Sequence, residues 1–222
     1  MKKTLEIALV VLALAASANA AKAATITYTL NDGGSCCTPA PFGTVTLTDI
    51  ALGNVQVTVA LTSGNRFVDT GGGGVFGFNL IGFSPSTPNP PISVANITSG
   101  FSLISGTAGA LSFSPFRNFE FGIACGVCGS GGSNPQLGPL MFNVLAANIT
   151  TASFVELSTT PNGSISAFFA ADIIDRNGRT GNVGVTGPGT PGTSVPDGGS
   201  TAALLGSVLF GVGLMRRKFG KV

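Results

Sequence analysis

The sequence predicts an all-β fold, an antiparallel β-sandwich of jelly-roll type, for the body of this 222-residue chain. Apolar residues alternate with threonines over 44–48, and alternation resumes over 55–62, beyond a turn at Leu52-Gly53-Asn54. This pattern is typical of a β-hairpin with one buried face. No part of the body repeats its apolar residues with the period of an amphipathic helix. Glycine, proline, asparagine and serine separate the remaining short apolar runs, as in sandwich proteins.

The predicted strands are short and rich in residues that favour strands. The first alternates threonine with Ile, Tyr and Leu, several later ones contain phenylalanine, and the last ends in Ala-Asp-Ile. We expect most of the 16 phenylalanines in the core, because phenylalanine has no polar group that would suit it to a wet surface. In chain order the predicted strands are 25–30, 44–48, 55–62, 75–81, 101–104, 119–123, 140–146, 153–157 and 165–173.

The two ends of the chain differ in composition from the body. Lys2 and Lys3 precede a short apolar run over 7–16, and small-x-small triplets follow at 18–20 and 21–23. These features predict a cleaved export signal at 1–23. The predicted organisation continues with a β-sandwich at 24–186, a Gly/Pro linker with a motif at 187–199, and a single membrane helix with a basic tail at 200–222.

Charge is distributed unevenly along the chain. The whole chain carries a formal charge of +2, but all its lysines lie in the two end segments. Between 24 and 193 there are four arginines and seven acidic residues, so this part carries −3. A mildly acidic body without a basic cluster argues against nucleic acid as a partner.

The four cysteines form two close pairs, Cys36-Cys37 and Cys125 with Cys128. A zinc site is the less favoured interpretation, because adjacent cysteines are poorly suited to one tetrahedral ion. A redox pair at Cys125 and Cys128 lacks the usual strand-to-helix setting. In an exported protein, two disulfides are the simplest expectation. Three connectivities are possible, and bridges between the two pairs would close a loop of about ninety residues, which stabilises by a few kcal/mol.

Two further motifs invite a ligand-binding interpretation. The segment 72–77 matches G-x-G-x-x-G but runs into a Phe-rich strand rather than a helix, so we expect an inter-strand loop. Asp172, Asp175 and Asn177 could supply oxygen ligands to Ca²⁺, although they equally suit a turn at a strand end. We expect no bound metal and no cofactor.

Few residues are available for catalysis. The chain has no histidine, which excludes the commonest general base and the Ser-His and Cys-His nucleophile pairs. We therefore expect that the protein is not an enzyme. A glycan-active enzyme would need two carboxyl groups about 5 to 10 Å apart in a cleft. The candidates are Glu120, Glu156, Asp172 and Asp175.

The C-terminal segment combines three features. Val195, Pro196 and Asp197 follow the linker, an apolar run covers 201–215, and Arg216, Arg217 and Lys218 come next. Fifteen helical residues span about 22 Å, short of the roughly 30 Å hydrocarbon core, and the basic end would remain cytoplasmic. The apolar residues expected in the membrane are Leu204, Leu205, Val208, Leu209, Phe210, Val212, Leu214 and Met215.

This three-part tail resembles the PEP-CTERM sorting signal of exported bacterial proteins, in its V-P-D-type variant. The resemblance implies that Val195, Pro196 and Asp197 form the motif recognised by an exosortase. It also implies a transient stay in the inner membrane, followed by delivery to the cell surface or extracellular matrix of a bacterium that makes exopolysaccharide. The alternative is a plain membrane anchor that is never cut.

The expected function is that of an exported structural or adhesive component of the polysaccharide layer. Its expected partners are an exosortase-type processing enzyme, extracellular polysaccharide and, transiently, the membrane. A carbohydrate-binding module is the first alternative, and polar side chains gathered on one sheet face would favour it. A glycan-active enzyme is the second.

Overall fold

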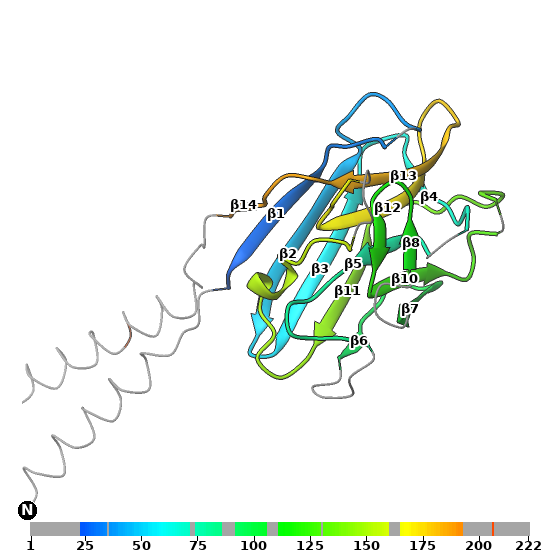
Figure 1. The fold of residues 1–222 in the computed structure, drawn as a ribbon. Helices are drawn as coiled ribbons and strands as arrows, with labels where there is room; N and C mark the ends of the chain where they lie inside the picture. The colour runs from blue at the N-terminus through cyan, green and yellow to red at the C-terminus, as the bar shows by residue number, and fades with distance from the viewer. Residues whose placement is uncertain are drawn as a thin grey trace, which may run out of the picture. The chain divides into compact units, whose positions relative to one another are not determined.

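Two antiparallel sheets and a separate hairpin make up the folded body (Figure 1). This computed structural model describes residues 23–34, 36–71, 74–85, 92–105, 111–129, 131–159, 165–192 and 206. One compact unit runs from Ala24 to Gly192. The all-β, antiparallel prediction is confirmed, and the inner faces of the two sheets share one core in a sandwich-like arrangement.

The two large sheets have six strands each. The first, in spatial order, is β14 (Thr190–Pro191), β1 (Thr25–Leu30), β2 (Gly43–Ala51), β3 (Asn54–Leu61), β11 (Leu140–Leu145) and β6 (Ser93–Ala95). The second is β13 (Thr180–Val185), β12 (Phe169–Ile174), β5 (Phe76–Phe78), β10 (Phe121–Cys125) and β7 (Phe101–Ser105), with β4 (Arg66–Phe67) also paired to β12. The separate hairpin is β8 (Leu111–Phe113) with β9 (Arg117–Phe119).

The predicted hairpin of the first sheet is present as β2 and β3. Thr46 faces Thr58 and Val45 faces Val59, so threonines and valines fall on opposite faces of the sheet. Val45 and Val59 are fully buried. Gly53 closes the turn with φ +71°, a conformation that glycine adopts without steric cost.

Phenylalanines fill the space between the sheets, as predicted. Phe76 of β5 lies 5.8 Å from Phe169 of β12 and 6.1 Å from Phe142 of β11, measured between ring centroids. The contact with Phe142 joins the two sheets. A second, smaller core lies under the β8–β9 hairpin, where Phe113, Phe116 and Phe119 pack against Ala167 and Ala170.

The strand predicted at 153–157 is wrong. The chain there forms a short 3₁₀ helix, η2 (Thr151–Phe154). The Asp49 carboxylate accepts a hydrogen bond from the Thr151 N–H at 2.8 Å, and the Phe154 ring is buried in the main core. One helical turn allows Thr151 to reach Asp49 and Phe154 to enter the core. The apolar residues of the segment do not by themselves distinguish such a turn from a strand.

The end of the body lies beyond the predicted boundary at 186. Thr190 and Pro191 of β14 face Thr27 and Ile26 of β1, and the Gly192 N–H donates to the Thr25 carbonyl at 2.7 Å. The first part of the predicted linker therefore belongs to the sheet. Its strand partner lies more than 160 residues earlier, so composition alone marked it as linker.

Both predicted terminal segments lie outside the described residues, apart from Ala23 and Gly206. Within the described part of the chain, no helix is long and apolar enough to cross a membrane.

Candidate functional site

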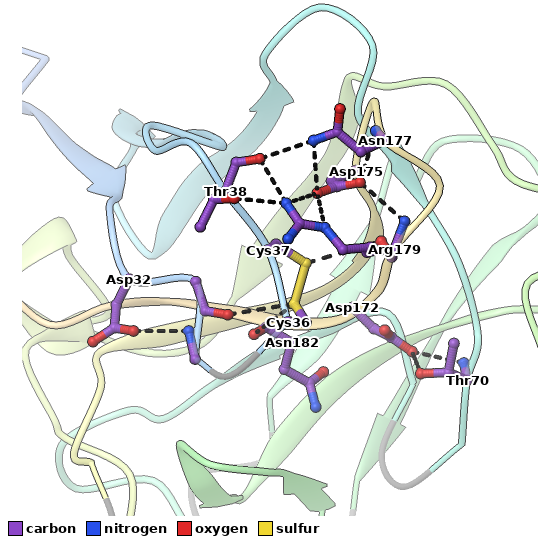
Figure 2. The surroundings of a disulfide bond; sticks show 12 residues. Asp32, Cys36, Cys37, Thr38, Thr70, Asp172, Asp175, Asn177, Arg179 and Asn182 are labelled. Atoms are coloured by element: carbon purple, nitrogen blue, oxygen red, sulfur yellow. Dashed lines mark hydrogen bonds and ion pairs between the residues drawn. A yellow bond between two sulfur atoms is a disulfide. The ribbon is translucent and has the colours of Figure 1, made fainter.

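The cysteines form two local disulfides, Cys36–Cys37 and Cys125–Cys128. Disulfide formation is as expected, but the bridge between the two pairs is not present. The bonded cysteines are one position apart in the first bridge and three apart in the second. Neither bridge therefore closes the loop of about ninety residues for which a stabilisation of a few kcal/mol was expected. No cysteine is left for a zinc site. The Cys36–Cys37 bridge lies beside β13, with Cys36 Sγ 3.8 Å from the Asn182 carbonyl (Figure 2).

Asp175 organises the turn between β12 and β13 (Figure 2). Its carboxylate accepts hydrogen bonds from the backbone N–H groups of Asn177 and Arg179, and the Arg179 guanidinium lies 2.9 Å from its Oδ2. The same guanidinium donates to the Thr38 carbonyl and hydroxyl oxygens. Burial by itself would raise the pKa of Asp175, but these donors outweigh it and lower the pKa from 3.8 to about 2.

Asp172 of β12 is the second buried carboxylate. The Thr70 N–H and hydroxyl both donate to its Oδ2 at 2.6 Å, while its Oδ1 finds no donor among the described residues. Burial raises the pKa of Asp172, the Thr70 hydrogen bonds oppose that rise, and the nearby Asp69 charge adds to it.

These surroundings bear on the calcium candidates. Asp175 and Asn177 contact each other, but the Asp175 carboxylate is occupied by Arg179 and by backbone N–H groups. Asp172 bonds instead to Thr70. Within the described residues, no three Asp, Glu, Cys or His side chains gather as a metal site. The hydrogen bonds of this segment are therefore those of a turn at the end of a strand, which was the alternative to a calcium site.

Glu120 and Glu156 are brought near each other by Asn79. The Asn79 Oδ1 accepts from the Glu120 N–H at 2.7 Å, and its Nδ2 donates to the Leu157 carbonyl at 3.0 Å. Burial raises the pKa of both glutamates, and the Glu156 charge raises that of Glu120 further. The other two acidic candidates belong to the separate Thr70 and Arg179 contacts, so the four do not form one site.

A pocket of about 210 Å³ lies beside the Asp175 turn, lined by Pro39, Pro41, Asn65 and Arg176 among others. Ligand pockets for small molecules usually measure about 300 Å³ or more. This pocket is smaller than that range.

The outward face of the first sheet carries an array of threonines that the sequence analysis did not single out. On β1 and β2, Thr25 faces Thr48, Thr27 faces Thr46 and Thr29 faces Thr44, and Thr46 also faces Thr58 of β3. The signal in the sequence was T-x-T-x-T, which occurs at both 25–29 and 44–48. We call this surface the threonine face; it comprises Thr25, Thr27, Thr29, Thr44, Thr46, Thr48, Thr58 and Gln56.

The predicted sorting motif, the membrane segment and the basic stop, which consists of Arg216, Arg217 and Lys218, lie outside the described residues, except Gly206 within the apolar run. Residues 194–219 match the family model of the VPDSG-CTERM motif. No curated protein and no solved structure matches the chain. The match covers only the tail, and it supports a sorting signal of the PEP-CTERM type at the end of an exported protein.

Proposed function

We propose that this protein is exported, cut in its C-terminal tail by an exosortase-type enzyme, and delivered to the cell surface or extracellular matrix. There it serves as a structural or adhesive component of the polysaccharide layer. The observation that carries the proposal is the match of 194–219 to the VPDSG-CTERM motif. Val195, Pro196 and Asp197 are the residues proposed for recognition, and 201–215 with the basic stop would hold the tail in the inner membrane during processing.

The positions at which the chain enters and leaves the fold are consistent with a folded body that has a signal at each end. Gly192 is hydrogen-bonded to Thr25, so the chain enters and leaves the fold at one sheet edge. Only Thr193 and Ser194 separate Gly192 from Val195.

The polar groups of the body support a non-enzymatic role. Asp175 is paired with Arg179, Asp172 is held by Thr70, and the chain has no histidine. A glycan-active enzyme would have to act through Glu120 and Glu156, the two acidic candidates that interact. Release of reducing ends from polysaccharide by the wild type, lost in Glu120→Gln, would establish that activity and end the non-enzymatic proposal.

A carbohydrate-binding module is the second candidate, and the threonine face favours it. Polar uncharged side chains gathered on one sheet face are the arrangement expected of such a module. This role is compatible with an adhesive component, since adhesion needs a surface that contacts the polymer.

The test is the intact mass of the protein recovered from the surface fraction of its own cells. We expect a mass that begins after the signal and ends near Asp197, and Asp197→Ala should keep the tail attached. Thr193→Ala, just outside the motif, serves as the matched control and should be processed normally. A wild-type mass that runs to Val222, or a protein confined to the cytoplasm, would contradict the proposal.

A further inference from the structure

The threonine face forms a regular two-dimensional array of hydroxyl groups. Residues that face each other across antiparallel strands share one side of the sheet, so the pairs Thr27–Thr46 and Thr46–Thr58 form one row. Thr25, Thr48 and Gln56 form the next row, and Thr29 with Thr44 a third. Successive threonines along one strand are about 6.7 Å apart, and neighbouring strands are about 4.8 Å apart.

The side chains of this array are partly accessible. Thr29 is exposed, and the other members of the threonine face are half-buried, as expected for close-packed side chains on an open sheet face. Hydroxyl oxygens lie 3.3 Å apart in the pair Thr27–Thr46 and 3.5 Å apart in Thr25–Thr48. Each hydroxyl keeps further capacity to donate or accept toward a partner above the sheet.

The opposite outer face is built differently. The second sheet presents Gly77 and Gly184 on its outer side, and the rings of Phe113 and Phe116 lie directly against them. The β8–β9 hairpin and the turn between its strands therefore cover part of that face. The threonine face is a polar sheet surface that is available to a partner.

The chemistry of the face indicates the kind of partner. Threonine is common in strands because its branched side chain suits the sheet, but strand propensity does not account for the absence of charge. The outward positions of β1, β2 and β3 between 25 and 60 hold threonine, asparagine, glutamine and alanine, with the exposed Ile50 near the end of β2, and no lysine, arginine or carboxylate. The whole chain has few charged residues, 9 % of its sequence, and this face has none.

We propose that the threonine face binds a neutral polysaccharide chain. This inference rests on the proposed role at the cell surface and names the partner and the surface used there. A saccharide presents hydroxyl groups and C–H groups alternately, and each threonine presents one hydroxyl and one methyl group at a spacing comparable to a sugar ring. An anionic polymer finds no cation on this face, so charge does not favour it.

The binding is weak for each sugar and cumulative along the polymer. The face has no aromatic ring on which a sugar could stack, and each hydroxyl exchanges a water hydrogen bond for one to the saccharide. Retention therefore depends on many contacts made in parallel by a repeating chain. Short oligosaccharides should bind far more weakly than the polymer.

The test compares retention of the processed protein by dextran, amylose and cellulose, with alginate as the anionic contrast, in native affinity gels or pull-down assays. The triple variant Thr27→Val, Thr46→Val, Thr58→Val removes one row of hydroxyls but keeps side-chain shape. We expect retention by a neutral polysaccharide to fall about tenfold or more. Thr180→Val with Ser102→Ala, exposed positions on the second sheet, is the matched control and should keep wild-type retention.

Equal retention of the wild type and the triple variant would overturn the inference. Wild-type retention by alginate alone, or by none of the polymers, would also overturn it. So would self-association that the triple variant abolishes, since the face would then bind a second copy. Thr46→Arg, which blocks the centre of the face, must weaken retention too, and thermal unfolding confirms that each variant is folded. The mass and location measurements are independent, so failure of polysaccharide binding leaves the proposed export and sorting intact.

Discussion

Asp172 and Asp175 lie three positions apart, yet their carboxylates meet opposite surroundings. Asp175 lies at the strand end, where backbone N–H groups and Arg179 converge on it and lower its pKa to about 2. Asp172 lies inside β12, where burial raises its pKa despite the Thr70 hydrogen bonds. At the strand end, backbone N–H groups are free to donate to a carboxylate, whereas those inside the strand are already paired with neighbouring strands. This is the physical reason for the difference.

Asp175 therefore gives the protein an acid-sensitive contribution to stability. Because its folded-state pKa is depressed, this contribution is present above the ordinary pKa near 3.8 and is lost as the pH falls toward about 2. We expect Asp175→Asn to lower the free energy of unfolding at pH 5, and the gap to the wild type to narrow between pH 4 and pH 2. Urea unfolding of both proteins at several pH values between 5 and 2 measures this difference in the free energy of unfolding. A gap as large at pH 2 as at pH 5 would show that charge is not the cause, and Asp32→Asn serves as control.

Among the elements, β14 connects the folded body to the sorting tail. It is only two residues long, but the Thr190 hydroxyl donates to the Thr27 carbonyl, and Gly189 lies against Tyr28 so closely that a Cβ there would clash with its ring. An enzyme cleft that binds an extended segment needs several residues in an open conformation. With two residues between Gly192 and the motif, we expect β14 to detach from β1 during processing.

A disulfide across this pair tests the expectation. Ile26 and Pro191 face each other across the strands, at a spacing that suits a disulfide. The double variant Ile26→Cys, Pro191→Cys should be cut more slowly than the wild type by membranes that contain the processing enzyme, and reductant should restore the rate. Thr44→Cys with Ala60→Cys, a facing pair on β2 and β3, controls for an added cross-link. Equal rates for the oxidised and reduced β14 variant would show that the edge strand does not detach.

At the scale of the whole molecule, the sheets are held together by aromatic packing rather than by long-range disulfides. Phe76 contacts Phe78 and Phe169 in its own sheet and Phe142 in the other. Both disulfides are local and leave the two sheets unlinked. Cooperative unfolding of the two sheets therefore depends on this core.

Phe76→Ala should lower the free energy of unfolding by about 4 kcal/mol, because it leaves a cavity where rings from both sheets meet. Phe168→Ala, a partly exposed ring against Tyr28, is the matched control and should cost clearly less. Urea unfolding followed by circular dichroism and by fluorescence measures both. If Phe76→Ala lowered the free energy of unfolding no more than Phe168→Ala, packing around Phe76 would not be what holds the two sheets together.

Local patterns in the sequence anticipated the features that depend on near neighbours. The alternation at 44–48 and 55–62 predicted β2 and β3 because side chains alternate across a strand, and the lack of helical periodicity predicted the all-β class. The tail was identified from residue order alone, and residues 194–219 match a motif model.

Long-range contacts decided the rest. The strand β13 (T-G-N-V-G-V) is one-third glycine and β14 has only two residues. Both form because β12 and β1 offer them a strand edge to pair with, which no local propensity reveals. Tertiary structure also paired each cysteine with its near neighbour and aligned threonines from three strands into one face. It gave Asp172 and Asp175 different partners, Thr70 for the first and Arg179 for the second. The sequence by itself determined which residues alternate and where the sorting signal lies. Only the fold determined which of those residues meet, because sheet register joins positions far apart in the chain.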